Sequence, residues 1–168
     1  RVRILHLGEG SRQGDVHFVD LLEQMGCTVI REPDAITVIG RRPLRGIEVD
    51  MNAISDTVPT LAALAPLAEG PVVIRNVQHI RYKETDRIAA VATELRRLGV
   101  RVEEFPDGLA IYPGPIQPAV IRTYRDHRMA MSFAVLGCAV PGIIIDDPGC
   151  VAKTFPDFFE RLAAALGR

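Results

Sequence analysis

The sequence predicts an α/β domain made of repeated strand–helix units, with apolar helices buried inside it. Two observations support this prediction. Landmark residues recur at a spacing of 71 positions. Two predicted helices are also nearly free of charged residues, which is typical of helices that are covered on every side. The landmarks that begin an amphipathic helix are Asp15, Asp86 and Asp157, and those that begin an apolar helix are Asp56 and His127.

The first cycle begins with a strand over Val2–Leu7, which leads through a polar loop into an amphipathic helix. One face of this helix carries Val16, Val19, Leu22 and Met25, at the spacing of a helix period. Gly26 follows at a position typical of a helix C-cap. A hairpin comes next, with Pro33-Asp34 as its turn. Its strands are Cys27–Arg31 and Ala35–Ile39. An apolar helix over Thr57–Glu69 closes the cycle.

The second cycle repeats this order, with a strand over Val72–Val77 and a glycine C-cap at Gly99. The apolar face of its amphipathic helix is formed by Ile88, Val91, Leu95 and Leu98. Its hairpin strands are Val100–Glu104 and Leu109–Tyr112, around the turn Pro106–Gly108. The second apolar helix spans Arg128–Val140. A third cycle starts with a strand over Ile143–Asp146 and a helix whose apolar face is Phe158, Leu162 and Leu166.

Units of this kind cannot bury their own apolar faces, so they must pack on one another. Three amphipathic helices but only two apolar ones are predicted. We therefore expect a further buried helix before Arg1, and an exposed apolar groove where that helix is absent. The third cycle stops at Gly167, so the strands that complete it should come from elsewhere. Coincidental spacing is the alternative, but the matched Asp, Gly and Pro-Asp landmarks argue against it.

Composition narrows the class of protein. Hydrophobic residues make up 48% of the chain and charged residues 24%, as in ordinary globular proteins. A formal net charge of -1 and few aromatic residues argue against nucleic-acid binding. No apolar run reaches membrane-spanning length. Three cysteines without C-x-x-C spacing argue against a disulfide framework or a zinc site, so we expect a cytoplasmic protein. Cys138, in an apolar helix, is expected to lie in the core.

Basic residues occur where three of the predicted helices begin, although the positive end of the helix dipole disfavours them. The segments are Lys83–Arg87, Asp126–Met131 and Ala152–Asp157. Unpaired backbone N–H groups together with added positive charge make an anion-binding site. Three such helix starts in a chain of net charge -1 predict a pocket for phosphate and carboxylate groups.

Each segment also has an ordinary structural explanation. The Lys83–Arg87 segment can be a solvated cluster of local ion pairs. Asp126 and Asp56 can serve as N-caps. Lys153 can be a solvated side chain before a helix that Thr154 caps.

The functional explanation assigns different tasks to these side chains. Arg87 and Arg128 can hold a carboxylate or phosphate in forked geometry, whereas Lys153 supplies a movable point charge. Asp56, a carboxylate among these cations, is suited to removing the proton of a hydroxyl group.

Several motifs resemble those of 5-enolpyruvylshikimate-3-phosphate synthases, and they occur in that family's order. They are Asp50–Asn52, Ser55-Asp56, Arg75-Asn76, Lys83–Arg87, Asp126–Met131 and Ala152–Asp157. The resemblance runs from Gln13 to the end of the chain. It implies an enolpyruvyl-transferase fold of βαβαββ-like units with the sheets outside. It also implies that residues 1–168 are most of the C-terminal domain of a two-domain enzyme, without its N-terminal domain and one buried helix.

The resemblance further implies a reaction of the shikimate pathway to chorismate and the aromatic amino acids. The enolpyruvyl (carboxyvinyl) group of phosphoenolpyruvate passes to the 5-hydroxyl of shikimate 3-phosphate and phosphate is released, without a metal or organic cofactor. Asp56 is then the base at the hydroxyl, and it contacts shikimate 3-phosphate together with Lys83. The residues that bind phosphoenolpyruvate are Arg87, Arg128 and Lys153. Glu84 and Lys153 are candidates for proton delivery to the methylene carbon, with His127 beside them.

One position departs from the family's pattern. Some members have an Asn that contacts shikimate 3-phosphate where this chain has His79, although a neutral His can still donate a hydrogen bond. The family's active site lies between two domains, so the expected partners are the two substrates and the N-terminal domain, and we expect this chain alone to be inactive. Two alternatives remain: a related enolpyruvyl transferase that acts on UDP-N-acetylglucosamine, and a non-catalytic anion-binding module of the same fold.

Overall fold

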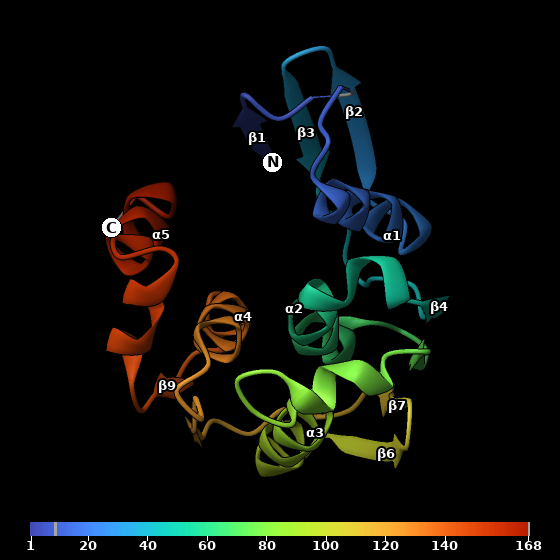
Figure 1. Cartoon of the computed structure of the whole chain (residues 1–168), viewed down its shortest axis with the longest axis vertical. Helices are drawn as coiled ribbons and strands as arrows, with labels where there is room; N and C mark the ends of the chain where they lie inside the picture. Colours follow the sequence, from blue (N-terminus) through green and yellow to red (C-terminus); the bar gives the residue numbers. More distant parts are fainter. Residues whose placement is uncertain (9, 168) are drawn as a thin grey trace.

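A computed structural model describes residues 1–8 and 10–167, and Figure 1 shows three groups of strands and helices around two central helices. The first group contains β1 (Val2–Leu5), β2 (Thr28–Glu32) and β3 (Ala35–Ile39), in the order β1-β3-β2 with antiparallel pairing throughout. A single turn of 3-10 helix, η1 (Gly14–His17), leads into α1 (Phe18–Gln24). The predicted hairpin and amphipathic helix of the first cycle are thus confirmed.

The second group is the most complete. Its sheet has the order β4-β5-β7-β6, with β4 parallel to β5 and the other pairs antiparallel. The strands are β4 (Glu48–Asp50), β5 (Val72–Arg75), β6 (Arg101–Phe105) and β7 (Gly108–Tyr112). The 3-10 helix η4 (Gln78–Tyr82) follows β5 and precedes α3 (Arg87–Arg97). Ile88, Val91 and Leu95 of α3 are fully buried, so the predicted apolar face does pack inward.

The third group is smaller. It has a two-stranded parallel sheet of β8 (Val120–Ile121) and β9 (Ile144–Ile145), followed by the 3-10 helix η5 (Pro148–Lys153) and α5 (Phe158–Ala165). No residue of α5 is buried. The amphipathic pattern of α5 therefore has little to pack against among the described residues.

Short strands β4 and β8 were not predicted from the sequence. Each pairs in parallel with the first strand of the following cycle, β4 with β5 and β8 with β9. They thus join one cycle to the next. Strands of three and two residues are too short for an alternating pattern to show.

Two backbone positions explain why glycine occurs at the ends of the amphipathic helices. Gly26 has φ +96° and Gly99 has φ +80°, a conformation that glycine adopts without steric cost. Both positions match the predicted C-caps.

The central pair of helices carries the core. It consists of α2 (Val58–Leu64), extended by η3 (Ala65–Leu67), and α4 (His127–Gly137). The two helices touch through Thr60 and Ser132, whose hydroxyl oxygens lie 3.1 Å apart. Val58 and Leu61 of α2 and Met129 and Phe133 of α4 are fully buried. No helix in the described part of the chain is both long and apolar enough to cross a membrane.

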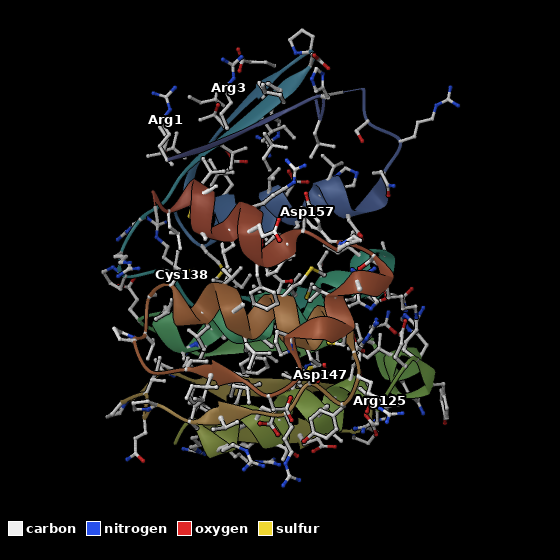
Figure 2. All side chains as sticks on the ribbon, turned by 90° about the vertical axis from the view of Figure 1, so that its left-hand side faces the viewer. Arg1, Arg3, Arg125, Cys138, Asp147 and Asp157 are labelled. Carbon is white, nitrogen blue, oxygen red and sulfur yellow. The ribbon has the colours of Figure 1, made fainter. Side chains whose placement is uncertain are left out.

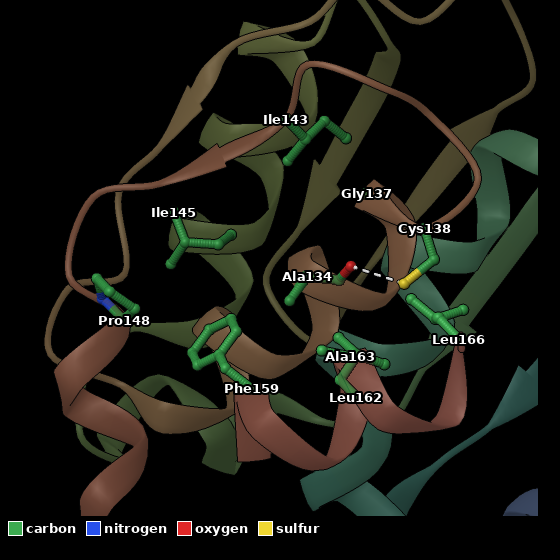
Figure 3. Close-up of a pocket in the computed structure, with 10 residues that line it drawn as sticks. All are labelled: Ala134, Gly137, Cys138, Ile143, Ile145, Pro148, Phe159, Leu162, Ala163 and Leu166. Atoms are coloured by element: carbon green, nitrogen blue, oxygen red, sulfur yellow. Dashed lines mark hydrogen bonds between the residues drawn. The ribbon is translucent and has the colours of Figure 1, made fainter. Parts of the chain in front are cut away.

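Helix α4 is not covered on every side, contrary to our expectation. Val135 is 37% exposed and Cys138, which was expected in the core, is exposed. Figure 2 shows this face, on which α5 and α4 lie one above the other. An apolar groove of about 400 Å³ separates them, and Figure 3 shows its lining, including Phe159, Leu162 and Leu166 of the C-terminal segment. That this groove is the place of a further buried helix stays a prediction.

Candidate functional site

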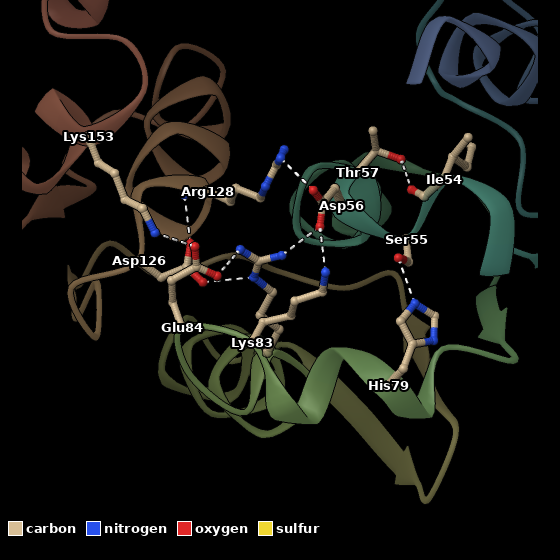
Figure 4. A network of polar contacts seen from close by, with 11 residues as sticks. Ile54, Ser55, Asp56, Thr57, His79, Lys83, Glu84, Asp126, Arg128 and Lys153 are labelled. Atoms are coloured by element: carbon tan, nitrogen blue, oxygen red, sulfur yellow. Dashed lines mark hydrogen bonds and ion pairs between the residues drawn. The ribbon is translucent and has the colours of Figure 1, made fainter. Parts of the chain in front are cut away.

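Charged side chains from four separate segments of the chain converge beside the first turns of α3 and α4 (Figure 4). They are Asp56 in the 3-10 helix η2 (Asn52–Thr57), Lys83 and Glu84 before α3, Arg87 at its first residue, Asp126 and Arg128 at the start of α4, and Lys153 at the end of η5. The structure therefore brings together the acidic and basic residues that the sequence singled out, which lie as far apart as positions 56 and 153.

Arg87 is at the centre of this cluster and is only 1% exposed. Its Nε donates to Oδ2 of Asp126 at 2.7 Å, and its Nη1 donates to Oδ1 of Asp56 at 2.9 Å. Its Nη2 donates to Oε2 of Glu84, also at 2.7 Å. A buried guanidinium is costly unless several anions offset its lost hydration. Three carboxylates do so here.

Asp56 bridges the cations of α3 and α4. Besides its contact with Arg87, its Oδ2 accepts from Nη2 of Arg128 at 2.6 Å, and Nζ of Lys83 lies 3.9 Å from its Oδ1. Its side chain keeps 35% exposure. We considered N-capping as a role for Asp56, and that alternative is wrong, because the residue before α2 is Thr57 and no side chain caps that helix.

Glu84 joins Arg87 to Lys153. Its Oε1 accepts from Nζ of Lys153 at 2.7 Å. The hydrogen bond from Lys153, a backbone hydrogen bond and the nearby charge of Arg87 lower the pKa of Glu84 to about 2, although burial opposes the shift. Glu84 is therefore an ionised carboxylate at neutral pH in this arrangement. It can deliver a proton only after a ligand has drawn Lys153 and Arg87 away from it.

Asp126 is fully buried and has two tasks. One oxygen holds Arg87, and the other accepts from the backbone N–H of Arg128 at 2.8 Å, which caps α4. Asp86 caps α3 in the same way through the N–H of Ala89 at 3.0 Å. The expected N-cap role of Asp126 is confirmed, but its ion pair is with Arg87 and not with Arg128.

These aspartate caps contradict part of the prediction for the anion site. We expected free N–H groups at three helix starts, yet at α3 and α4 an aspartate of the chain already accepts one of them. Lys153 is not at a helix start at all, because it ends η5 and α5 begins after Asp157. Thr154 caps no α-helix. The positive side chains, and not the helix termini, thus define the site.

His127 and Arg128 follow the cap. His127 is 4% exposed, and burial lowers its pKa, so its imidazole is neutral at neutral pH. Nδ1 of His127 and Nε of Arg128 are buried and have no hydrogen-bond partner among the described residues. Buried polar atoms without partners are uncommon and often mark functional positions. His127 is therefore placed next to the cations but is not a charged member of the cluster.

His79 lies at the edge of the site. Its Nε2 is 2.8 Å from Oγ of Ser55, the residue before Asp56, as Figure 4 shows. His79 also lines a depression of about 330 Å³ together with Asn52, Asn76 and Tyr82. The predicted contact of His79 with shikimate 3-phosphate stays a prediction.

Charge balance decides what the cluster can do. Four cations, Lys83, Arg87, Arg128 and Lys153, meet three carboxylates, Asp56, Glu84 and Asp126. One net positive charge remains, and most cationic donors are already paired. Lys83 and Lys153 are the most exposed of the cations, at 42% and 59%. An anionic ligand would therefore compete with Glu84 and Asp56 for most of these donors, and Lys83, whose Nζ lies 3.9 Å from Oδ1 of Asp56, is the most loosely held of the cations.

Comparisons with known proteins agree with the resemblance seen in the motifs. A sequence model of the family described as EPSP synthase (3-phosphoshikimate 1-carboxyvinyltransferase) matches residues 1–162. The 3-phosphoshikimate 1-carboxyvinyltransferase of Nostoc punctiforme is 65% identical over 166 residues, which cover 99% of this chain and 39% of that protein. The chain thus spans about two fifths of the length of the curated relatives that it matches.

Two solved structures share the fold. An EPSP synthase structure from Acinetobacter baumannii superposes with a TM-score of 0.85 at 30% identity, over 98% of this chain and 41% of the other. The enolpyruvyl transferase NikO from Streptomyces tendae gives a TM-score of 0.75 at 29% identity, over 98% of this chain and 38% of the other. The predicted enolpyruvyl-transferase fold is confirmed.

Proposed function

Because the chain belongs to the EPSP synthase (3-phosphoshikimate 1-carboxyvinyltransferase) family, we propose that it supplies one part of the active site of such an enzyme. The reaction transfers the enolpyruvyl group of phosphoenolpyruvate to the 5-hydroxyl of shikimate 3-phosphate and releases phosphate. The single observation that supports this role best is the network of Asp56, Glu84, Arg87, Arg128 and Lys153. It combines cations for two anionic substrates with carboxylates for proton transfer.

We assign the first proton transfer to Asp56. Its carboxylate takes the proton of the 5-hydroxyl while that oxygen forms a bond to C2 of phosphoenolpyruvate. A proton added to the methylene carbon completes a tetrahedral intermediate. Loss of a proton from the resulting methyl group and of phosphate from C2 then restores the double bond. Asp56 is suited to this task because it is 35% exposed and therefore accessible to a substrate.

Arg128, Lys153 and Arg87 are assigned to phosphoenolpyruvate, and Lys83 to shikimate 3-phosphate. Phosphate and carboxylate oxygens compete with Glu84 for Lys153 and Arg87, whose bonds hold the pKa of Glu84 near 2. Substrate binding thus raises this pKa and makes Glu84 a better proton donor. In this scheme Arg87 contacts the ligand only after Glu84 or Asp56 moves, because its side chain is 1% exposed.

We propose that residues 1–168 are most of the C-terminal domain of a two-domain enzyme, and that the chain alone does not turn over. The test is to measure phosphate release from phosphoenolpyruvate and shikimate 3-phosphate with the chain alone, with the remaining part of the enzyme added, and with that part plus an Asp56→Asn chain. We expect release only in the second case. Turnover by the chain alone would refute its dependence on the other part.

The two alternatives predict other outcomes. A folded chain that gives no turnover even with the remaining part, yet binds phosphoenolpyruvate, would favour an anion-binding module. An enzyme that acts on UDP-N-acetylglucosamine would be stabilised against thermal unfolding by that compound and not by shikimate 3-phosphate.

A further inference from the structure

A strained turn leads into the charged cluster. Tyr124 and Arg125 have φ values of 55° and 57°, a backbone conformation that residues other than Gly, Asn and Asp rarely adopt. The N–H of Asp126 donates to the carbonyl of Thr123 at 2.9 Å. Two consecutive positive φ values within such a bond are the signature of a type I′ turn, which normally contains Asn-Gly. Other contacts must therefore hold this turn.

Glu94, in the middle of α3, supplies those contacts. Its carboxylate is fully buried. Oε2 accepts from the backbone N–H of Arg122 at 3.0 Å, and Oε1 accepts from the phenol of Tyr124 at 2.7 Å. Nε of Arg97 lies 3.0 Å from Oε2 and balances the charge. A buried carboxylate that holds a backbone N–H and a side chain of the same short segment fixes the path of that segment.

Two side chains of helix α3 thus form hydrogen bonds with residues 122–126. Arg87 and Glu94 are separated by seven residues, so they lie on the same face of the helix. Glu94 holds the beginning of the segment, and Arg87 holds its last residue, Asp126. Asp126 in turn accepts from the backbone N–H of Arg128 and so fixes the backbone of Arg128 in the first turn of α4. The position of Arg128 therefore depends on both contacts.

We propose that Glu94 is a positioning residue for the anion site: through Tyr124 and Arg122 it holds the strained turn that places Asp126 and Arg128. This inference rests on the proposed function, because it concerns the affinity of the same site for phosphoenolpyruvate. Glu94 itself is fully buried, and its partners Arg97, Arg122 and Tyr124 are not members of the cluster. Its loss should shift Arg128 without removing any charge from the cluster.

The test uses the complete enzyme that contains this chain, with the variants Glu94→Gln and Tyr124→Phe. We expect Glu94→Gln to raise the KM and the Kd for phosphoenolpyruvate by about tenfold or more, since small displacements of a positioning group have effects of that size. Tyr124→Phe removes one of the two contacts and should have a smaller effect in the same direction. Calorimetric titration with phosphoenolpyruvate gives the Kd independently of turnover.

Two controls separate positioning from general stability. Val72→Ala, at the fully buried first residue of β5, should lower Tm but leave both constants unchanged at temperatures well below Tm. Arg125 is exposed, and Arg125→Gly relieves the positive φ at no steric cost. Combined with Glu94→Gln, it should restore much of the affinity, because the turn then needs less support.

Unchanged KM and Kd in Glu94→Gln would overturn the inference, and so would a change that Val72→Ala reproduces at equal loss of Tm. Absence of turnover in the unmodified enzyme would instead refute the proposed function. The Kd measurements would still decide the role of Glu94 in that case.

Discussion

Arg87 and Glu94 lie on one face of α3 and are both buried charges, at 1% and 0% exposure, but their surroundings differ. Arg87 is a cation held by three carboxylates, of which Asp56 and Glu84 are 35% and 27% exposed. Glu94 is an anion held by a guanidinium, a phenol and a backbone N–H. The partners of Arg87 are all side chains, whereas those of Glu94 include the backbone N–H of Arg122.

This difference indicates how one helix can serve both binding and architecture. The side-chain carboxylates of Asp56 and Glu84 can exchange with the oxygens of a ligand without moving the backbone. The backbone N–H that binds Glu94 cannot leave without moving the turn that carries it. We therefore expect ligands to bind at the Arg87 end, and the Glu94 end to keep the geometry of the site fixed.

The largest expected loss of stability follows from replacing Arg87. Arg87→Met removes the common partner of three carboxylates and leaves Asp126 buried without its cation. The free energy of unfolding should fall by about 3–5 kcal/mol, as when one member of a buried ion pair is deleted. Arg128→Met is the matched control, since the Arg128 side chain is 28% exposed and its guanidinium pairs only with Asp56 among the described residues. Chemical denaturation of both variants checks this, and equal losses would contradict the central role of Arg87.

A smaller change in the free energy of unfolding is expected at acid pH, from Glu84 at the Arg87 end of α3. The pKa of Glu84 falls from 4.5 to about 2 on folding, so the folded state favours its ionised form. This contribution is complete above pH 4.5 and is lost as the pH falls towards 2. Denaturation midpoints measured across this range should drop in the native protein. In Glu84→Gln the denaturation midpoint should depend less on pH between pH 4.5 and 2. An unchanged dependence would show that other carboxylates cause the loss of stability at acid pH.

The smallest change in the free energy of unfolding is expected at alkaline pH, from Tyr124 at the Glu94 end of α3. Burial and the hydrogen bond to Glu94 raise the pKa of Tyr124 from 10.0 to about 12. The folded state therefore favours the neutral phenol, and the contribution is present below pH 10 and lost as the pH rises towards 12. Because Tyr124 is 37% exposed, solvent should keep the change small. Ultraviolet titration of tyrosine ionisation, with Tyr124→Phe as the control, tests the shift directly. A phenol that titrates normally would contradict it.

The sequence by itself determined the order of the elements and the repeat. Helix periods, the glycines at positions 26 and 99 and the hairpin turns are local signals, because each depends on residues within a few positions of one another. The motifs also indicated Asp56, Glu84, Arg87, Arg128 and Lys153 as a group, and the structure brings them together. Their roles as base, proton donor and ligand contacts stay predictions.

Only the tertiary structure decided which charges pair. Asp126 was expected as an N-cap, but it also binds Arg87, which lies 39 residues away in the chain. The contacts of Glu94 with Arg122 and Tyr124 span 28 and 30 residues, and no sequence pattern indicated them. The open face of α4 and the strands β4 and β8 were missed for the same reason. Burial and pairing depend on what the rest of the fold places opposite a residue, and that information does not reside in its neighbours along the chain.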